Sequence, residues 1–338
     1  MRLAIRHTTR YRFQQPVRYG LQRLRLTPKT TQGQEIVDWT MTFDGAHQEL
    51  SYDDQNFNRV ILAGVEEGVQ EVTISCNGVV RTEDRAGVIG HHSGHLPLWA
   101  FLGQTPLTRP GPRIRQLIAS VGRSADGMVP TLHNLSSAIL ERVPYRTGGT
   151  AVTTTAEEAV GAGQGGVCQD HAHIFIAAAR SLDIPARYVS GYLMLNDRVE
   201  QHATHAWAEA WVQGLGWVGF DISNGISPDP RYVRVATGRD YRDAAPITGI
   251  SYGAVTEDLI VDLAVEQQAP DQSQSQSQSG GGSQSQSQSE GGSQSQSQSE
   301  GAGGTPAPAP DAAPAQHQRD ARSQGQQHSA QQQVGPGA

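Results

Sequence analysis

The sequence is short of cysteine and of long apolar runs. Only two cysteines, Cys76 and Cys168, occur in 338 residues, which excludes a disulfide framework and favours a reducing compartment, so we expect a cytoplasmic protein. No segment approaches the ~20 apolar residues of a membrane span. The N-terminus, MRLAIRHTTRYRF, also lacks the apolar core of a signal peptide, so we expect no membrane association.

Positive charge is scarce as well. The formal net charge is -7, the isoelectric point is near 5.9, and no basic cluster is present. Nucleic-acid binders need a clustered basic face, so this composition excludes a nucleic-acid partner. Lys29 is the only lysine, and arginine supplies the other basic side chains, a bias that we attribute to the codon usage of a GC-rich genome.

Apolar side chains are almost missing from the C-terminal part of the chain. From about Gln267 the sequence consists of Gln, Ser, Gly, Pro and Ala, with repeats such as QSQSQSQSGGGS and QSQSQSEGGS. Nothing there offsets the backbone entropy of ordering, so the sequence predicts a disordered tail over residues 267–338. The remaining residues are enough for one sizeable core or two.

The first part of the chain has the alternation of β-strands. Runs such as EIVDWTMTF and EVTISCNGVV are separated by Gly, Asp and Asn turns, which predicts a sandwich-like β domain over residues 1–95. Cys76 shares its parity with Val72 and Ile74, so we expect it inside the core. The HHSGH cluster at residues 91–95, where this domain ends, is typical of a His-rich linker, and we place the linker over residues 96–111.

Helical periodicity begins at Pro112, where a second domain over residues 112–266 is predicted. Thr155, followed three residues later by Glu158, is the signature of a capping box. The run QDHAHIFIAAARSLDI predicts a buried helix ending before Pro185, and ARYVSGYLML predicts a strand. We expect a last alternating run, 259–265, to close the sheet of this domain.

Cys168 lies directly after a glycine pair, at the start of the buried helix. The unpaired N–H groups and the dipole of a helix N-terminus stabilise a thiolate, and we expect Gly165 and Gly166 to leave the sulfur unobstructed. This setting is typical of a nucleophile. A thiol nucleophile needs a histidine to take its proton and a third group to orient that histidine.

The runs HAWAEAWV and WVGFDIS, joined by QGLG, predict a hairpin that supplies both partners. With residues 213–215 as the loop, Val212 pairs with Gly216, which places Asp221 diagonal to His205 on one face. Diagonal neighbours in a sheet lie about 7 to 8 Å apart at Cα. The two side chains are therefore within reach of one another.

Three stretches carry a family resemblance: GGVCQDHAHIFIAAARSLDIPARYVSGY, THAWAEAWVQGLGWVGFDISNG and YVRVATGRDY. They resemble bacterial transglutaminase-like proteins, a branch of the superfamily of transglutaminases and related cysteine peptidases and amidases. The resemblance covers residues 1–266, including the β domain that precedes the core in this branch. It implies an α+β fold, with an N-terminal β-sandwich-like domain and a papain-like transglutaminase core whose cysteine begins a buried helix packed on an antiparallel sheet.

The resemblance also implies the chemistry, without a cofactor. Cys168 is the nucleophile, His205 the acid and base, and Asp221 its orienting partner, for acyl transfer from a peptide or another amide substrate through a thioester. The Cys168 amide is the first candidate for the oxyanion donor. The other oxyanion or substrate-contacting candidates are Gln169, Tyr145 and Trp207; packing across the hairpin is the commoner role for such a tryptophan.

Rival interpretations remain open at this point. Water resolves the thioester in a peptidase or amidase, whereas an amine acceptor resolves it in a transglutaminase, for which the Gln-rich tail would be an acyl donor beside a body almost free of lysine. A metal site is the alternative of another class, with the ligands Cys168, His171, His173, His202 and His205. A scaffold protein with a catalytically inactive site is disfavoured, because the triad is intact. The sequence does not predict the oligomeric state.

Overall fold

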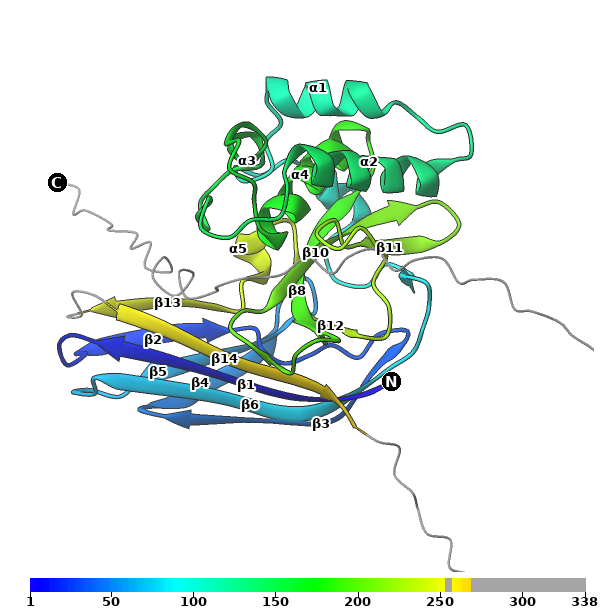
Figure 1. Cartoon of the computed structure of the whole chain (residues 1–338). Helices are drawn as coiled ribbons and strands as arrows, with labels where there is room; N and C mark the ends of the chain where they lie inside the picture. Colours follow the sequence, from blue (N-terminus) through cyan, green and yellow to red (C-terminus); the bar gives the residue numbers. More distant parts are fainter. Residues whose placement is uncertain (253–256, 269–338) are drawn as a thin grey trace, which may run out of the picture. The chain divides into compact units, whose positions relative to one another are not determined.

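The structure is a computed structural model that describes residues 1–252 and 257–268 (Figure 1). The predicted tail beyond Gln268 lies outside the described residues. The strands before the helices are β1 (Arg2–Phe13), β2 (Tyr19–Leu24), β3 (Gln34–Asp44), β4 (Ala46–Asp53), β5 (Arg59–Val65), β6 (Glu71–Thr82) and β7 (Val88–Gly90). The 3-10 helix and the α-helices are η1 (Leu98–Phe101), α1 (Pro112–Val121), α2 (Met128–Arg142), α3 (Ala156–Gly161), α4 (Cys168–Ser181) and α5 (Tyr241–Ala244). The remaining strands are β8 (Ala186–Leu193), β9 (Glu200–Gln201), β10 (His205–Val212), β11 (Gly216–Phe220), β12 (Tyr232–Gly238), β13 (Ile247–Tyr252) and β14 (Glu257–Gln267).

The predicted sandwich-like N-terminal region is confirmed. One sheet has the order β3-β6-β1-β14-β9 and the other the order β13-β2-β5-β4. Alternate residues of β1 and β6 are buried, as expected for strands with one face on a core. The two sheets share a core that includes Phe13, Ile74 and Leu24. Cys76 belongs to this core and has no exposed surface, as its parity predicts.

The last two strands among the described residues do not lie where we expected. β14 pairs with β1 over its whole length and contacts β9, while β13 pairs with β2. The expectation that the run 259–265 closes the sheet of the second domain is therefore wrong. Its alternating pattern predicts a strand with one buried face, but that pattern carries no information about which sheet buries it.

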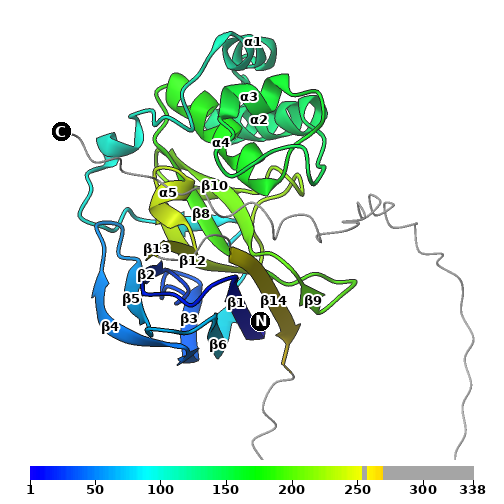
Figure 2. The ribbon, with the colours of Figure 1, turned by 90° about the vertical axis from the view of Figure 1, so that its left-hand side faces the viewer.

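A third sheet, with the order β12-β8-β10-β11-β7, belongs to the second half of the described chain. It also includes β7, which comes from the N-terminal region. The α4 helix packs on one face of this sheet, against the alanines 206, 208 and 210 of β10. Small side chains let the helix come close to the strand, and the whole run from Ala172 to Ala179 is buried. Figure 2 shows the helices on one side of this sheet and the N-terminal strands on the other.

The predicted hairpin and capping box are both confirmed. Val212 pairs with Gly216, and the register continues through Ala208 opposite Phe220. The Thr155 hydroxyl accepts a hydrogen bond from the Glu158 N–H, and the Glu158 carboxylate accepts from the Thr155 N–H at 2.9 Å. These features depend on residues close in sequence, which is why the sequence predicts them.

β12 lies at the edge of its sheet, and two side-chain amides from the N-terminal region satisfy its outward backbone groups. The Gln34 amide accepts from the Arg234 N–H at 2.7 Å and donates to the Arg234 carbonyl at 2.8 Å. The Asn58 amide makes the same pair of contacts with Thr237, both at 2.8 Å. Each amide therefore takes the place of one residue of a neighbouring strand. We call Gln34 and Asn58 the amide clamps.

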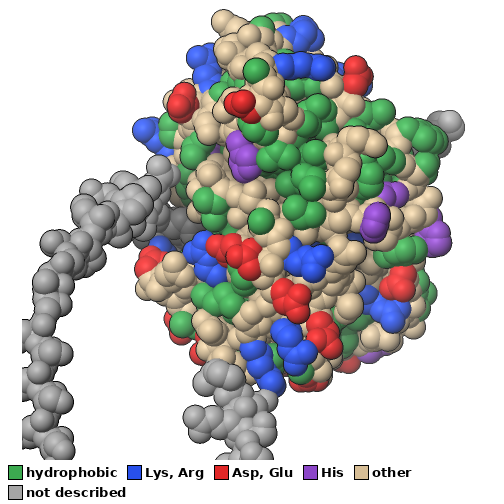
Figure 3. All heavy atoms as spheres, turned by 90° about the vertical axis from the view of Figure 1, so that its right-hand side faces the viewer, with side chains coloured by type: hydrophobic (Ala, Val, Ile, Leu, Met, Phe, Trp, Pro, Cys, Tyr) green, Lys and Arg blue, Asp and Glu red, His purple; other side chains and the backbone are tan. Residues whose placement is uncertain are grey.

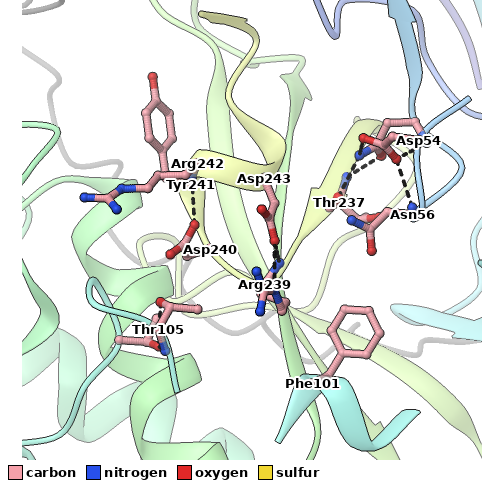
Figure 4. Close-up of polar contacts among 12 residues, drawn as sticks. Asp54, Asn56, Phe101, Thr105, Thr237, Arg239, Asp240, Tyr241, Arg242 and Asp243 are labelled. Atoms are coloured by element: carbon pink, nitrogen blue, oxygen red, sulfur yellow. Dashed lines mark hydrogen bonds and ion pairs between the residues drawn. The ribbon is translucent and has the colours of Figure 1, made fainter. Parts of the chain in front are cut away.

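The end of β12 and the start of α5 carry further polar contacts (Figure 4). Figure 4 shows Thr237 beside Asp54 and Asn56, and Arg239 joined to Asp243. Lys29 lies at the same junction, where its ammonium donates to the Asn56 carbonyl at 2.6 Å and to the Thr237 hydroxyl at 2.9 Å. The single lysine of the chain is thus engaged between the N-terminal strands and β12.

Residues 96–111, predicted as a linker, are packed against the core. Arg180 is buried, with 4% of the residue exposed. Its guanidinium donates to the Phe101 carbonyl and to the Thr108 hydroxyl. The amide of Gln104 donates to the Ala177 carbonyl at 3.0 Å. The segment is therefore fastened along α4.

The surface view of Figure 3 shows charges of both signs interspersed over the part formed by the N-terminal strands, and apolar side chains gathered above them. Within residues 1–252 and 257–268, none of the helices has both the length and the apolar character that a membrane span requires.

Candidate active site

Cys168 is the first residue of α4, and it is partly buried. The chain reaches it through Gly165, whose φ of +83° is in the region that favours glycine. A Cβ on Gly165 would also lie 2.4 Å from the Pro144 carbonyl oxygen. Gly165 therefore allows a close approach between backbone segments, whereas a Cβ on Gly166 would meet the Asp170 and Val143 side chains at 3.1 to 3.2 Å.

Asp170 caps this helix. Its carboxylate accepts from the Val167 N–H at 2.9 Å and from the Thr150 hydroxyl at 2.6 Å. Burial raises the pKa of Asp170, and the two hydrogen bonds oppose that effect. The side chain is thus part of the support of the helix start, as a residue in the first helical turn is expected to be.

The hairpin brings His205 and Asp221 together. His205 begins β10, Asp221 follows β11, and the His205 Nε2 lies 2.6 Å from the Asp221 Oδ2. His205 is 8% exposed and Asp221 is fully buried. Because Nε2 is taken by the carboxylate, Nδ1 is the ring nitrogen left to meet a thiol.

The electrostatics of the pair support an imidazolium beside a carboxylate. Burial lowers the pKa of His205, but the Asp221 charge and the hydrogen bonds to Asp221 and Cys168 outweigh it and raise the pKa to about 10. For Asp221, burial raises the pKa, while His205 and the other hydrogen-bond donors lower it below its ordinary value. A thiol close to an imidazolium is the arrangement that activates cysteine nucleophiles.

Two residues that sequence reasoning missed also hold Asp221. The Tyr232 hydroxyl donates to Asp221 Oδ2 at 2.7 Å, and the Asn224 amide donates to the same oxygen at 2.7 Å. Tyr232 begins β12, which pairs with β8 and not with the hairpin. The only signal in the sequence was that both residues fall in or beside the stretches that carry the family resemblance.

Trp207, a candidate for substrate contact, lies behind the imidazole. It is 1% exposed, its ring is stacked 6.2 Å from the His205 ring, and it packs with Val189 and Leu193. This position makes Trp207 a packing residue behind the imidazole. Trp207 also lines a small pocket together with Tyr232 and Arg234, which residues of the N-terminal strands complete.

The two other candidates lie beside the nucleophile. The Gln169 amide donates to the Val152 carbonyl at 3.0 Å, so it holds the loop before α3. Tyr145 pairs with Gly166 through a backbone bridge, and its ring lies 6.1 Å from that of His171. Both residues therefore contact the segment that carries Cys168.

Two histidines of the rival metal site are engaged elsewhere. His171 contacts the Ser223 hydroxyl at 2.8 Å and the Val143 carbonyl at 2.7 Å. His173 accepts from the Tyr241 N–H at 3.1 Å, and burial lowers its pKa to about 3. No group of three or more His, Cys, Asp or Glu side chains with a geometry for a metal occurs among residues 1–252 and 257–268.

Comparison with known proteins gives the family that the sequence resembles. Residues 115–222 match the transglutaminase-like superfamily, and residues 3–81 match the bacterial transglutaminase-like N-terminal region. The chain belongs to this superfamily, in the branch that carries the N-terminal region.

Curated relatives from mycobacteria are similar over most of the chain. The chain is 30% identical over 292 residues to the uncharacterized protein Rv2569c of Mycobacterium tuberculosis, covering 78% of this chain and 92% of that protein. It is 28% identical over 282 residues to the uncharacterized protein ML0607 of Mycobacterium leprae, covering 78% of this chain and 98% of that protein.

A solved structure shares the fold. A Cytophaga hutchinsonii protein described as a "Putative Cysteine Protease" superposes with a TM-score of 0.63 at 23% identity, covering 80% of this chain and 92% of that one. The fold is therefore that of a transglutaminase-like core preceded by a β-sandwich.

Proposed function

We propose that the protein is a cysteine peptidase or amidase that cleaves amide bonds through Cys168, His205 and Asp221. The observation that carries this proposal is the 2.6 Å contact between the His205 and Asp221 side chains. The interaction of Cys168 with the same imidazole contributes to the raised pKa of His205. Order along the chain, setting at a helix start and partner types all agree with thiol catalysis.

The reaction follows from these positions. The Cys168 sulfur attacks the carbonyl carbon of the amide, and the His205 imidazolium gives its proton to the leaving amine. Water then attacks the thioester, His205 takes its proton, and the acid product and the free thiol are released. Asp221 stays ionised and keeps the imidazole in one orientation.

The Cys168 amide is our candidate for the oxyanion donor. As the first N–H of α4 it has no acceptor within the helix, and it points from the positive end of the helix dipole. Tyr145 and Gln169 are neighbouring candidates for a second donor. Peptides or other amides are the proposed substrates, and two unpaired cysteines support a cytoplasmic location.

The test is a screen of fluorogenic peptide and amide substrates with the full chain. We expect Cys168→Ser and His205→Ala to lower kcat/KM by at least about 1,000-fold. Cys76→Ser is the matched control, because it removes the other thiol, which is buried in the N-terminal core. Equal cleavage by Cys168→Ser and the unaltered protein would refute the proposal.

Transamidation is the second candidate, and the position of Lys29 favours it. The side-chain amine of the only lysine is engaged at a junction of strands, so the enzyme offers no free lysine that would resolve its own thioester. Incubation with a labelled amine separates the two reactions. Label on glutamines between residues 272 and 333 would support transamidation, whereas release of ammonia without label would support hydrolysis.

A further inference from the structure

The buried carboxylate of Asp221 accepts hydrogen bonds from other side chains besides His205. Oδ2 accepts from His205 at 2.6 Å, from the Tyr232 hydroxyl at 2.7 Å and from the Asn224 amide at 2.7 Å. The Asn224 N–H also donates to Oδ1 at 3.3 Å. Asp221 has no exposed surface, so water does not take the place of a donor that is lost.

Resting on the proposed function, we infer that Tyr232 is a positioning residue, whose hydroxyl holds the Asp221 carboxylate in the orientation that meets His205. A carboxylate with a free χ2 has a broad range of orientations, and a second strong donor from another strand narrows that range. Tyr232 acts on the reaction through Asp221 and touches no reacting atom.

The ring of Tyr232 serves the same purpose. It lies 5.5 Å from the Trp207 ring at 84° and 6.0 Å from the His205 ring. Trp207 and Tyr232 thus form two adjoining walls around the imidazole. Tyr232 is only 5% exposed, so its hydroxyl bond to the carboxylate is shielded from competing water.

The strand that carries Tyr232 is held from outside its own sheet. The amide clamps Gln34 and Asn58 fix the backbone of β12 two and five residues further along, at Arg234 and Thr237. Tyr232 itself lies beyond both segments that match the family, which end at residues 81 and 222. The N-terminal sandwich therefore supports the position of Asp221 through β12 and Tyr232.

The test replaces the hydroxyl alone, in Tyr232→Phe of the full chain. The readout is the rate of iodoacetamide alkylation of Cys168 at neutral pH, located by mass spectrometry. We expect a loss of about tenfold, because a charge-assisted hydrogen bond that holds the pair is removed. Because the hydroxyl lowers the pKa of Asp221, we also expect the acid limb of the alkylation profile to move to higher pH.

Tyr192→Phe is the matched control. Tyr192 lies on β8, directly beside Val233 of β12, has no exposed surface, and its hydroxyl bonds to the His7 Nδ1 at 2.9 Å. The Tyr192→Phe variant also loses a buried tyrosine hydroxyl. We expect the rate of Cys168 alkylation and its pH profile to be unchanged.

A double-mutant cycle shows the route of the effect. In an Asp221→Ala background we expect Tyr232→Phe to cause no further loss, because the residue through which it acts is absent. An equal loss in both backgrounds, or a loss as large in Tyr192→Phe, would overturn the inference.

The two proposals fail in different ways. Alkylation needs no substrate, so a chain that alkylates as expected but cleaves no amide contradicts the proposed function and leaves the role of Tyr232 supported. If His205→Ala slows alkylation and Tyr232→Phe does not, only the role of Tyr232 is overturned. If neither variant slows it, both proposals are overturned.

Discussion

At the residue scale, the site depends on how burial and partner charges balance. His205 and Asp221 are each unfavourable as buried ions, yet each supplies the charge that the other needs. Breaking such a pair by removing one charge is costly, because the other remains buried without compensation. The pair therefore adds a pH dependence to the stability of the protein.

The sign of that dependence follows from the two shifts. His205 has a pKa of about 10 in the folded protein against an ordinary 6.5, so its contribution is full below pH 6.5 and is lost as the pH rises toward 10. Asp221 has a pKa below the ordinary 3.8, so its contribution is present above pH 3.8 and is lost as the pH falls through the lower value.

We therefore predict that Asp221→Asn lowers the free energy of unfolding most between about pH 4 and 6.5, and less as the pH approaches 10. Urea denaturation of both proteins at pH 5.5, 8 and 10 measures the difference. Asp262→Asn is the control, since the Asp262 side chain is 49% exposed in its pair with Arg10 and its loss should cost under about 1 kcal/mol. A difference for Asp221→Asn that grows with pH would refute the assignment.

At the scale of elements, the edge strand β12 carries the link between the two halves of the described chain. Without the amide clamps, the outward N–H groups of Arg234 and Thr237 and the Thr237 carbonyl would lose their partners, while the Arg234 carbonyl would keep the Lys29 N–H. The clamps make β12 rigid where it presents Tyr232 to the site.

Gln34→Ala removes three side-chain hydrogen bonds, two with the Arg234 backbone and one to the Lys29 carbonyl. It leaves the Arg234 N–H of β12 without a partner, while the Arg234 carbonyl keeps the Lys29 N–H. We expect a loss of about 2 kcal/mol in the free energy of unfolding and a slower alkylation of Cys168. Urea denaturation and labelling measure the two effects. Gln70→Ala is the control, because Gln70 is exposed and makes only a 3.5 Å contact with the Gln14 carbonyl; an equal loss in this variant would argue against the clamp.

The helices and the hairpin show which features local sequence patterns can predict. The start of α4 at Cys168, the capping box at Thr155 and the hairpin register at Val212 were all predicted, and all are confirmed. Each depends on residues within a turn or a hairpin. The helix nevertheless ends at Ser181, four residues before Pro185, because Asp183 adopts a φ of +60°.

At the scale of the whole described chain, the strands are interleaved. β7 joins the sheet of the second half, and β13 and β14 join the sheets of the first half. A core that includes Ile5, Tyr192 and Val265 runs across this junction. The two halves therefore share hydrogen bonds and apolar contacts along several strands.

We predict that residues 112–266 expressed alone do not fold cooperatively. The fragment lacks β7, exposes β13 without its partner, leaves β14 paired only with the short β9, and loses the clamps on β12. Near-ultraviolet circular dichroism and dye binding should show a chain without fixed packing. Residues 1–268 are the control and should unfold in one transition; a cooperative transition of the shorter fragment would contradict the prediction.

The sequence by itself determined the candidate catalytic residues and their local settings: a thiol at a helix start, and a histidine and an aspartate on one face of a short hairpin. Helix caps, turn residues and side-chain periods act over a few positions, and so they can be interpreted without the fold. Only the tertiary structure decided that Tyr232 supports Asp221, that amides from the N-terminal sandwich hold β12, and that the last strand pairs with the first. Those pairings join residues up to hundreds of positions apart, and which strands meet depends on how the whole chain buries its apolar faces.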